Sequence, residues 1–95
     1  MNAFDFTLVK QRLESLSEQV AERKVDQIAL QAGILAEYLD KCSVAVQDKD
    51  IRHLCGEITY SVRAVELYSD VPAVAARHLN QAIEALRGSR MYPKS

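Results

Sequence analysis

Residues 28–65 read IALQAGILAEYLDKCSVAVQDKDIRHLCGEITYSVRAV. Apolar side chains recur in both halves of this stretch at alternating steps of four and three residues, a spacing that gathers them on one face of an α-helix. If the chain turns back at residues 47–50, apolar residues of the two halves meet in pairs whose numbers always sum to 97. The stretch therefore predicts an antiparallel helical hairpin. Its pairs are Val46 with Ile51, Cys42 with Cys55, Leu39 with Ile58, Leu35 with Val62 and Ala32 with Val65.

The composition indicates one small all-α domain. A chain of 95 residues can build a single modest core, and three Gly, two Pro and no strand-like alternation leave helices as its regular structure. The 12 Lys and Arg against 13 Asp and Glu argue against binding nucleic acid through non-specific phosphate contacts. Because apolar runs stay well short of the roughly 20 residues of a membrane span, we expect a soluble, cytoplasmic protein with no membrane partner.

Apolar periodicity and capping residues predict a small antiparallel four-helix bundle around the hairpin. Asp5 or Thr7 can cap the first helix, Pro72 suits the first turn of the last helix, and Gly88 its C-cap. The predicted helices span about 7–23, 26–46, 50–68 and 72–87, followed by a flexible tail at 89–95.

Two alternatives remain open between the first two helices. The apolar phase slips by one residue after Val20, although neither Gly nor Pro marks a break. We favour a turn at residues 23–25, with Asp26 as the cap of a new helix. The alternative is one bent helix from about 7 to 46, on the order of 60 Å long, followed by two helices. Its first half would then need cover from a second chain in a dimer.

The second helix is apolar on more than one side. Leu30, Ile34 and Tyr38 form a further stripe beside the hairpin seam, which predicts that this helix is the central one of the bundle. Gly33 costs roughly 1 kcal/mol in a helix interior relative to Ala, so we expect another helix to approach its backbone closely.

Residue spacing favours neither catalysis nor metal binding. Cys42 and Cys55 share a rung of the hairpin, but buried free thiols are the better interpretation because neighbouring helix axes lie 8–10 Å apart. His53 lies two positions from Cys55 and points to another face of the helix. The paired carboxylates at Glu37 and Asp40 suit a solvated helix face. We therefore predict no catalytic residues, no cofactor and no metal.

Charge and terminal aromatic residues give the candidates for partner binding. Four acidic residues follow one another at i, i+4 from the first helix onward and predict an acidic ridge that could face a basic surface, in this chain or in a second copy. Aromatic residues flank the helical region and could dock as arms, or could instead pack onto the first helix and close the end of the bundle. The acidic candidates are Glu14, Glu18, Glu22 and Asp26, the basic ones Arg77, Arg87 and Arg90, and the aromatic ones Phe4, Phe6 and Tyr92.

These patterns favour a non-enzymatic protein–protein interaction module, such as an adaptor, small chaperone, inhibitor or immunity-type binder. Its partner would be another protein or a second copy of the chain. The alternative is a small helical nucleic-acid-binding or regulatory protein that uses Arg77, Arg87, Arg90 and Lys94 of the basic C-terminal helix and tail.

Overall fold

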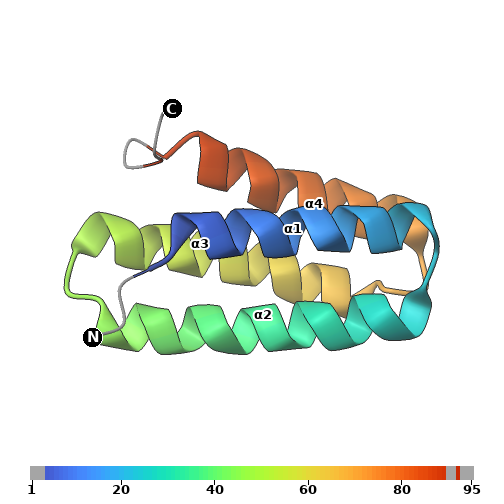
Figure 1. Ribbon diagram of the computed structural model, residues 1–95, viewed down its shortest axis with the longest axis horizontal. Coiled ribbons are helices and arrows are strands. Elements are labelled where there is room, and N and C mark those ends of the chain that lie inside the picture. The colour runs from blue at the N-terminus through green and yellow to red at the C-terminus, as the bar shows by residue number, and fades with distance from the viewer. Residues whose placement is uncertain (1–3, 90–91, 93–95) are drawn as a thin grey trace.

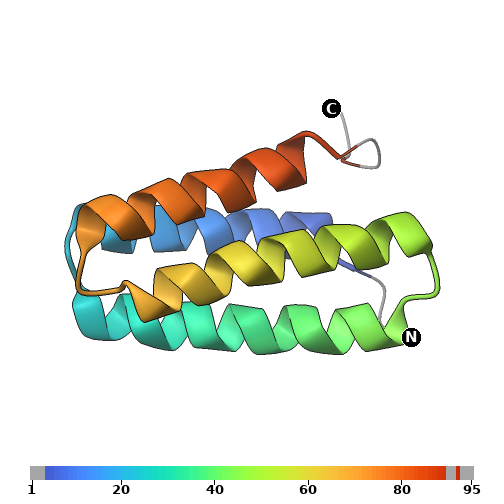
Figure 2. The same cartoon turned by 180° about the vertical axis from the view of Figure 1, so that it is seen from behind.

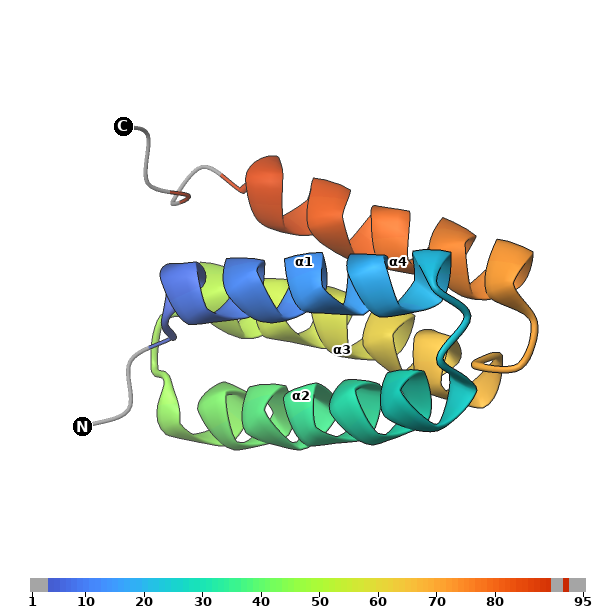
Figure 3. The ribbon, with the colours of Figure 1, turned by 45° about the vertical axis from the view of Figure 1, so that its right-hand side comes forward.

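The computed structural model, which describes residues 4–89 and residue 92, is an antiparallel bundle of four helices (Figure 1). Consecutive helices run in opposite directions around a ring, so that α2 packs against α1 and α3, and α4 packs against α3 and α1 (Figures 2 and 3). The four-helix prediction is confirmed. Its helices are α1 (Phe6–Ala21), α2 (Val25–Ala45), α3 (Lys49–Leu67) and α4 (Pro72–Arg87).

The break between α1 and α2 is made by Arg23, whose φ of 60° turns the chain without a glycine. The amide of Lys24 donates to the carbonyl of Gln19, and the amide of Arg23 donates to the carbonyl of Val20. These two bonds form a Schellman motif, which satisfies carbonyls at the end of α1. The alternative of one long bent helix is therefore wrong.

Asp26 does not cap the second helix, contrary to expectation. Because the turn ends one residue earlier than predicted, α2 begins at Val25 and Lys24 occupies the N-cap position without a side-chain cap bond. Asp26 instead lies in the first turn of α2, where its negative charge suits the positive end of the helix dipole.

The other helix ends follow the predicted capping chemistry. The Asp5 carboxylate accepts a hydrogen bond from the amide of Leu8 at 3.1 Å, so Asp5 rather than Thr7 caps α1. Asp48 accepts from the amides of Asp50 and Ile51, which starts α3 one residue before the predicted range. Pro72 opens α4, and Gly88 is its C-cap.

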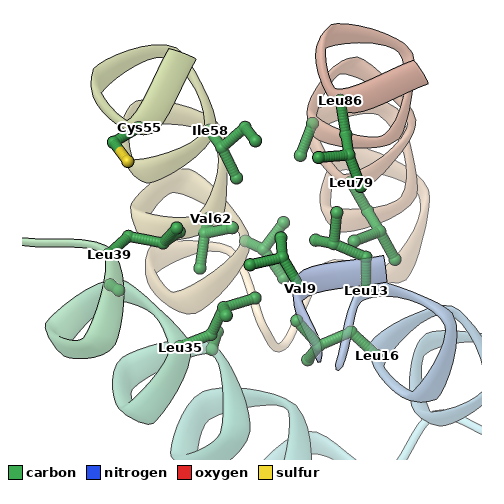
Figure 4. Packing of buried hydrophobic residues seen from close by; sticks show 14 of the residues in the cluster. Val9, Leu13, Leu16, Leu35, Leu39, Cys55, Ile58, Val62, Leu79 and Leu86 are labelled. Carbon is green, nitrogen blue, oxygen red and sulfur yellow. The ribbon is translucent and has the colours of Figure 1, made fainter. Parts of the chain in front are cut away.

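The core lies where the hairpin pattern placed it. On α2 and α3 the four inner pairs are at most 3% exposed, and they face the stripes of α1 and α4 across the bundle (Figure 4). The outermost pair, Val46 and Ile51, is partly buried because it sits beside the turn. The stripes of α1 and α4 consist of Val9, Leu13, Leu16 and Val20, and of Ala75, Leu79, Ala82 and Leu86.

The prediction that the second helix is central is wrong. Among the described residues, α2 packs against only two of the other three helices, and it occupies a corner of the bundle like the rest. Leu30 and Ile34 are therefore 60% and 48% exposed instead of being covered by a further helix. In the part of the chain that the structure describes, no helix combines the length and apolarity needed to cross a membrane.

Candidate interaction surface

The acidic ridge is shorter than its spacing predicts. Glu14 and Glu18 lie exposed on α1, but α1 ends before Glu22, which is its C-cap residue. The carboxylate of Glu22 pairs with the ammonium of Lys24 at 3.0 Å, and Asp26 lies on the next helix. The turn thus divides a run of acidic residues that one continuous helix would have aligned.

The basic residues of α4 do not gather into one surface. Arg87 lines a hollow between α4 and α1 together with Lys10 and Glu14, while Arg77 lies ten residues earlier, roughly 80° away around the helix. Both side chains are exposed, and Glu84 lies on the solvent side of α4 between them. Arg90 and Lys94 fall outside the described residues.

The N-terminal aromatic residues close the end of the bundle. Phe4 is only 6% exposed and belongs to the core, so the expectation of an exposed docking arm is wrong for this residue. Its ring meets that of Phe6 edge-to-face at 4.8 Å between centroids, and Phe6 meets Tyr92 at 6.0 Å. Burial of these rings in or against the core is favoured over exposure to water because their apolar area is large.

The two cysteines are free and buried. Burial, with a smaller contribution from the neighbouring Cys42, raises the pKa of Cys55 to about 11. Burial and a hydrogen bond with Cys42 also raise the pKa of Tyr38 to about 12. Since the thiolate is the reactive form of cysteine, a thiol held protonated in this way is a poor nucleophile at neutral pH.

Carboxylates and histidines form no metal-binding group of three or more among residues 4–89 and 92. A hollow between α3 and α4 is lined by His53, Glu57 and Glu84 among others. The His53 imidazole lies 3.8 Å from the Glu57 carboxylate, and its side chain is 79% exposed. Such a site offers little of the shielding that shifts titratable groups towards catalytic roles.

Large apolar side chains are exposed on both helices of the hairpin formed by α2 and α3. Leu30 and Ile34 project from α2 with 60% and 48% exposure, and Tyr60 and Leu67 project from α3 with 76% and 72% exposure. Tyr60 and Leu67 are seven residues apart, which places them within about 20° of each other around α3. Tyr60 also lines a hollow with Gln81 and Ala85 of α4, so it lies at the α4 edge of this surface. We call the outer side of α2 and α3 that carries these four residues the hairpin face.

A groove runs along the hairpin face between its two helices. On the α2 side, Ala29 and Gly33 carry little or no side chain and so leave space for the groove. Apolar and charged side chains both line this groove. The groove is lined by Ala29, Leu30, Gly33, Ile34, Glu37, Arg63 and Glu66.

Arg63 forms ion pairs with two carboxylates beside this groove. Its guanidinium donates to the Asp40 carboxylate on α2 at 2.7 Å and lies 3.7 Å from the Glu66 carboxylate one turn along α3. A Cβ built on Gly33 would lie 3.0 Å from Oε2 of Glu66. The expected close approach at Gly33 thus comes from an acidic side chain rather than from a helix backbone.

The chain matches no protein-family model, and no curated protein or solved structure is significantly similar to it.

Sequence reasoning identified part of the hairpin face but gave it another role. The apolar stripe that contains Leu30 and Ile34 predicts packing inside the bundle, whereas the structure leaves both side chains exposed. Tyr60 and Leu67 were missed. The available signal was the hairpin register itself, because Leu30 and Leu67 also sum to 97 and so lie at the same height on the two helices.

Proposed function

We propose that this chain is a non-enzymatic protein–protein interaction module and that the hairpin face is its binding surface. The observation that carries the proposal is the presence of four large, exposed apolar side chains on the two helices of one hairpin, two of which line the groove between those helices. Contiguous exposed apolar surface on a small protein is characteristic of binding sites, and single scattered residues are not.

The polar groups of the hairpin face support the same role. Arg63 is held by Asp40 and lies near Glu66, so its position is largely set before a partner arrives. A preordered arginine loses less side-chain entropy on binding than a free one. Arginine and tyrosine are also the residue types that contribute most to interface energies, and the hairpin face presents both Arg63 and Tyr60.

In this proposal the part of the acidic ridge on α1 is a solvated helix face and not a binding surface. Glu14 and Glu18 lie on the outer side of α1, away from the hairpin face, with polar neighbours at Gln11 and Ser15. Charges of this kind steer encounter more than they add affinity.

The test compares capture of partners by purified wild-type protein and by two surface variants. The double variant Leu30→Gln/Ile34→Gln removes apolar surface from the hairpin face, and Val71→Gln is its control because Val71 is 41% exposed at the N-cap of α4 without lining the groove. We expect the double variant to lose the bound protein, whether a second copy or another chain, and the control to keep it. Retention of the same proteins by both variants would refute the proposal, provided that circular dichroism shows both to be folded.

A further inference from the structure

The outer side of α2 carries the acidic Asp26 towards one end and the basic Lys41 towards the other. Lys41 has Glu37 and Asp40 as neighbours, and Asp40 is already paired with Arg63 at 2.7 Å. Asp26 and Lys41 are both exposed, and 15 residues separate them, so they lie within about 60° of each other around the helix. The midpoint between them falls at residues 33 and 34, in the middle of the hairpin face. A second α2 laid antiparallel over the first at this midpoint would place each Asp26 opposite Lys41 of the other copy.

The outer side of α3 has the same centre. Tyr60 and Leu67 are its two most exposed apolar residues, and the midpoint between them falls at residues 63 and 64. Because paired residues of the two helices have numbers that sum to 97, this midpoint lies at the same height as residues 33 and 34 of α2. The neighbouring positions of Cys42 and Cys55 in the structure agree with this pairing. A single two-fold axis that crosses the hairpin at this height can therefore place Asp26 of one copy opposite Lys41 of the other. The same axis places Tyr60 of one copy opposite Leu67 of the other.

From this coincidence we infer that the partner of the hairpin face is a second copy of this chain, bound antiparallel about a two-fold axis beside Gly33. The inference rests on the proposed function and names its partner. In such a dimer Tyr60 packs against Leu67 of the other copy, and Asp26 pairs with Lys41 of the other copy. A two-fold interface uses the same patch on both subunits, so the patch must be complementary to itself, and the reciprocal pairing of Asp26 with Lys41 provides this complementarity.

The size of the hairpin face is sufficient for a specific dimer. The bundle is 35 Å long, and two helices side by side are about 20 Å wide, which offers about 700 Å² per copy. Standard interfaces bury about 800 Å² per partner. At the axis, the Glu66 carboxylate of each copy lies over its own Gly33, and the Arg63 guanidinium 3.7 Å from that carboxylate offsets its charge.

The outer side of α1 lacks the apolar part of such a surface, because none of the large exposed apolar side chains in the described part of the chain lies on α1. Glu14 and Glu18 occupy its middle, so two antiparallel copies of α1 would bring four carboxylates together. Like charges in such proximity oppose association. This contrast makes Glu18 a suitable control position.

The experiment is sedimentation equilibrium of the full chain at low ionic strength, from low micromolar to high micromolar concentration. We expect Asp26→Lys and Lys41→Asp each to raise the dimer Kd about tenfold, and the double variant to return it to within about threefold of wild type. Glu18→Lys makes the same charge change on α1 and should leave the Kd unchanged. Leu67→Gln should weaken the dimer through the loss of its contact with Tyr60.

Three results would overturn the inference. They are a wild-type chain that stays monomeric throughout, single variants that dimerise as tightly as wild type, and a double variant no tighter than the single ones. A monomer that still captures another protein through Leu30 and Ile34 would refute the second copy and leave the proposed function standing. Capture independent of Leu30 and Ile34, in a monomeric chain, would refute both.

Discussion

The carboxylate of Glu66 on α3 lies over Gly33 on α2, so that a Cβ at position 33 would come within 3.0 Å of Oε2. The contact joins the two helices at the centre of the hairpin face, where Arg63 also lies 3.7 Å from the Glu66 carboxylate. It shows why a residue that weakens a helix interior stands there: the groove is occupied by a charged side chain that needs room.

The two glycines of the hairpin helices provide a matched pair of substitutions. Gly56→Ala introduces a methyl group with no atom within 4 Å, so it should raise the free energy of unfolding by roughly 0.5–1 kcal/mol. Gly33→Ala should stabilise less, because its methyl group displaces the Glu66 carboxylate. Urea unfolding of both variants measures the difference, and an equal gain would show that the contact with Glu66 has no energetic effect.

The buried hairpin pairs predict coupled core truncations. Leu39 and Ile58 are fully buried, so Leu39→Ala and Ile58→Ala should each cost roughly 2–5 kcal/mol of unfolding free energy. Because the two side chains belong to one rung, the double variant should depart from the sum of the single effects. Chemical denaturation of the three variants measures the coupling. Small, additive losses would contradict the pairing.

The left-handed backbone at Arg23 predicts that glycine is better tolerated there than arginine. An L-residue pays roughly 1–2 kcal/mol for this conformation, whereas glycine pays mainly in unfolded-state entropy. Arg23→Gly should therefore raise the unfolding free energy by roughly 0.5–1 kcal/mol, as measured by thermal or urea denaturation. A loss of stability would mean that the Arg23 side chain contributes more than its backbone costs.

The buried thiol predicts a loss of stability at alkaline pH. The pKa of Cys55 is raised from 9.0 to about 11 in the folded chain, so between these values the unfolded state has lost a proton that the folded state retains. The unfolding free energy should therefore be unaffected by this group below about pH 9 and should fall as the pH rises towards about 11. Urea unfolding under reducing conditions at about pH 8 and about pH 10.5 measures the decline. It should be smaller in Cys55→Ala, and an identical decline in that variant would assign the effect to other groups, such as Tyr38.

The fold could be predicted from sequence because its main determinants are local and periodic. The seams of α2 and α3 needed only helical spacing and a turn at residues 47–50, and the caps at Asp5 and Asp48 follow from short polar side chains before apolar runs. The turn at Arg23 was harder, since its left-handed conformation is carried by a residue type that rarely adopts it. Because α2 begins one residue earlier than predicted, Asp26 lies in the first turn of the helix instead of at its N-cap.

The candidate surface was harder to predict because exposure depends on which helices are neighbours. A stripe such as Leu30 and Ile34 has the same spacing whether a third helix covers it or water does. Phe4 shows the converse case, since a residue before the first helix has no periodicity to reveal that it belongs to the core. Sequence spacing indicates which residues share a face, and only packing decides which faces remain open.

The most direct test of the hairpin face as a binding surface is a map of backbone amide chemical shifts in uniformly ¹⁵N-labelled protein as its concentration is raised. At 10.7 kDa the monomer gives well-resolved spectra. We predict that the amides that shift belong to residues 26–41 of α2 and 60–67 of α3, while the outer side of α1 at residues 11–18 stays unchanged. Shifts confined to α1 or α4, or no shift at any concentration, would contradict self-association through the hairpin face.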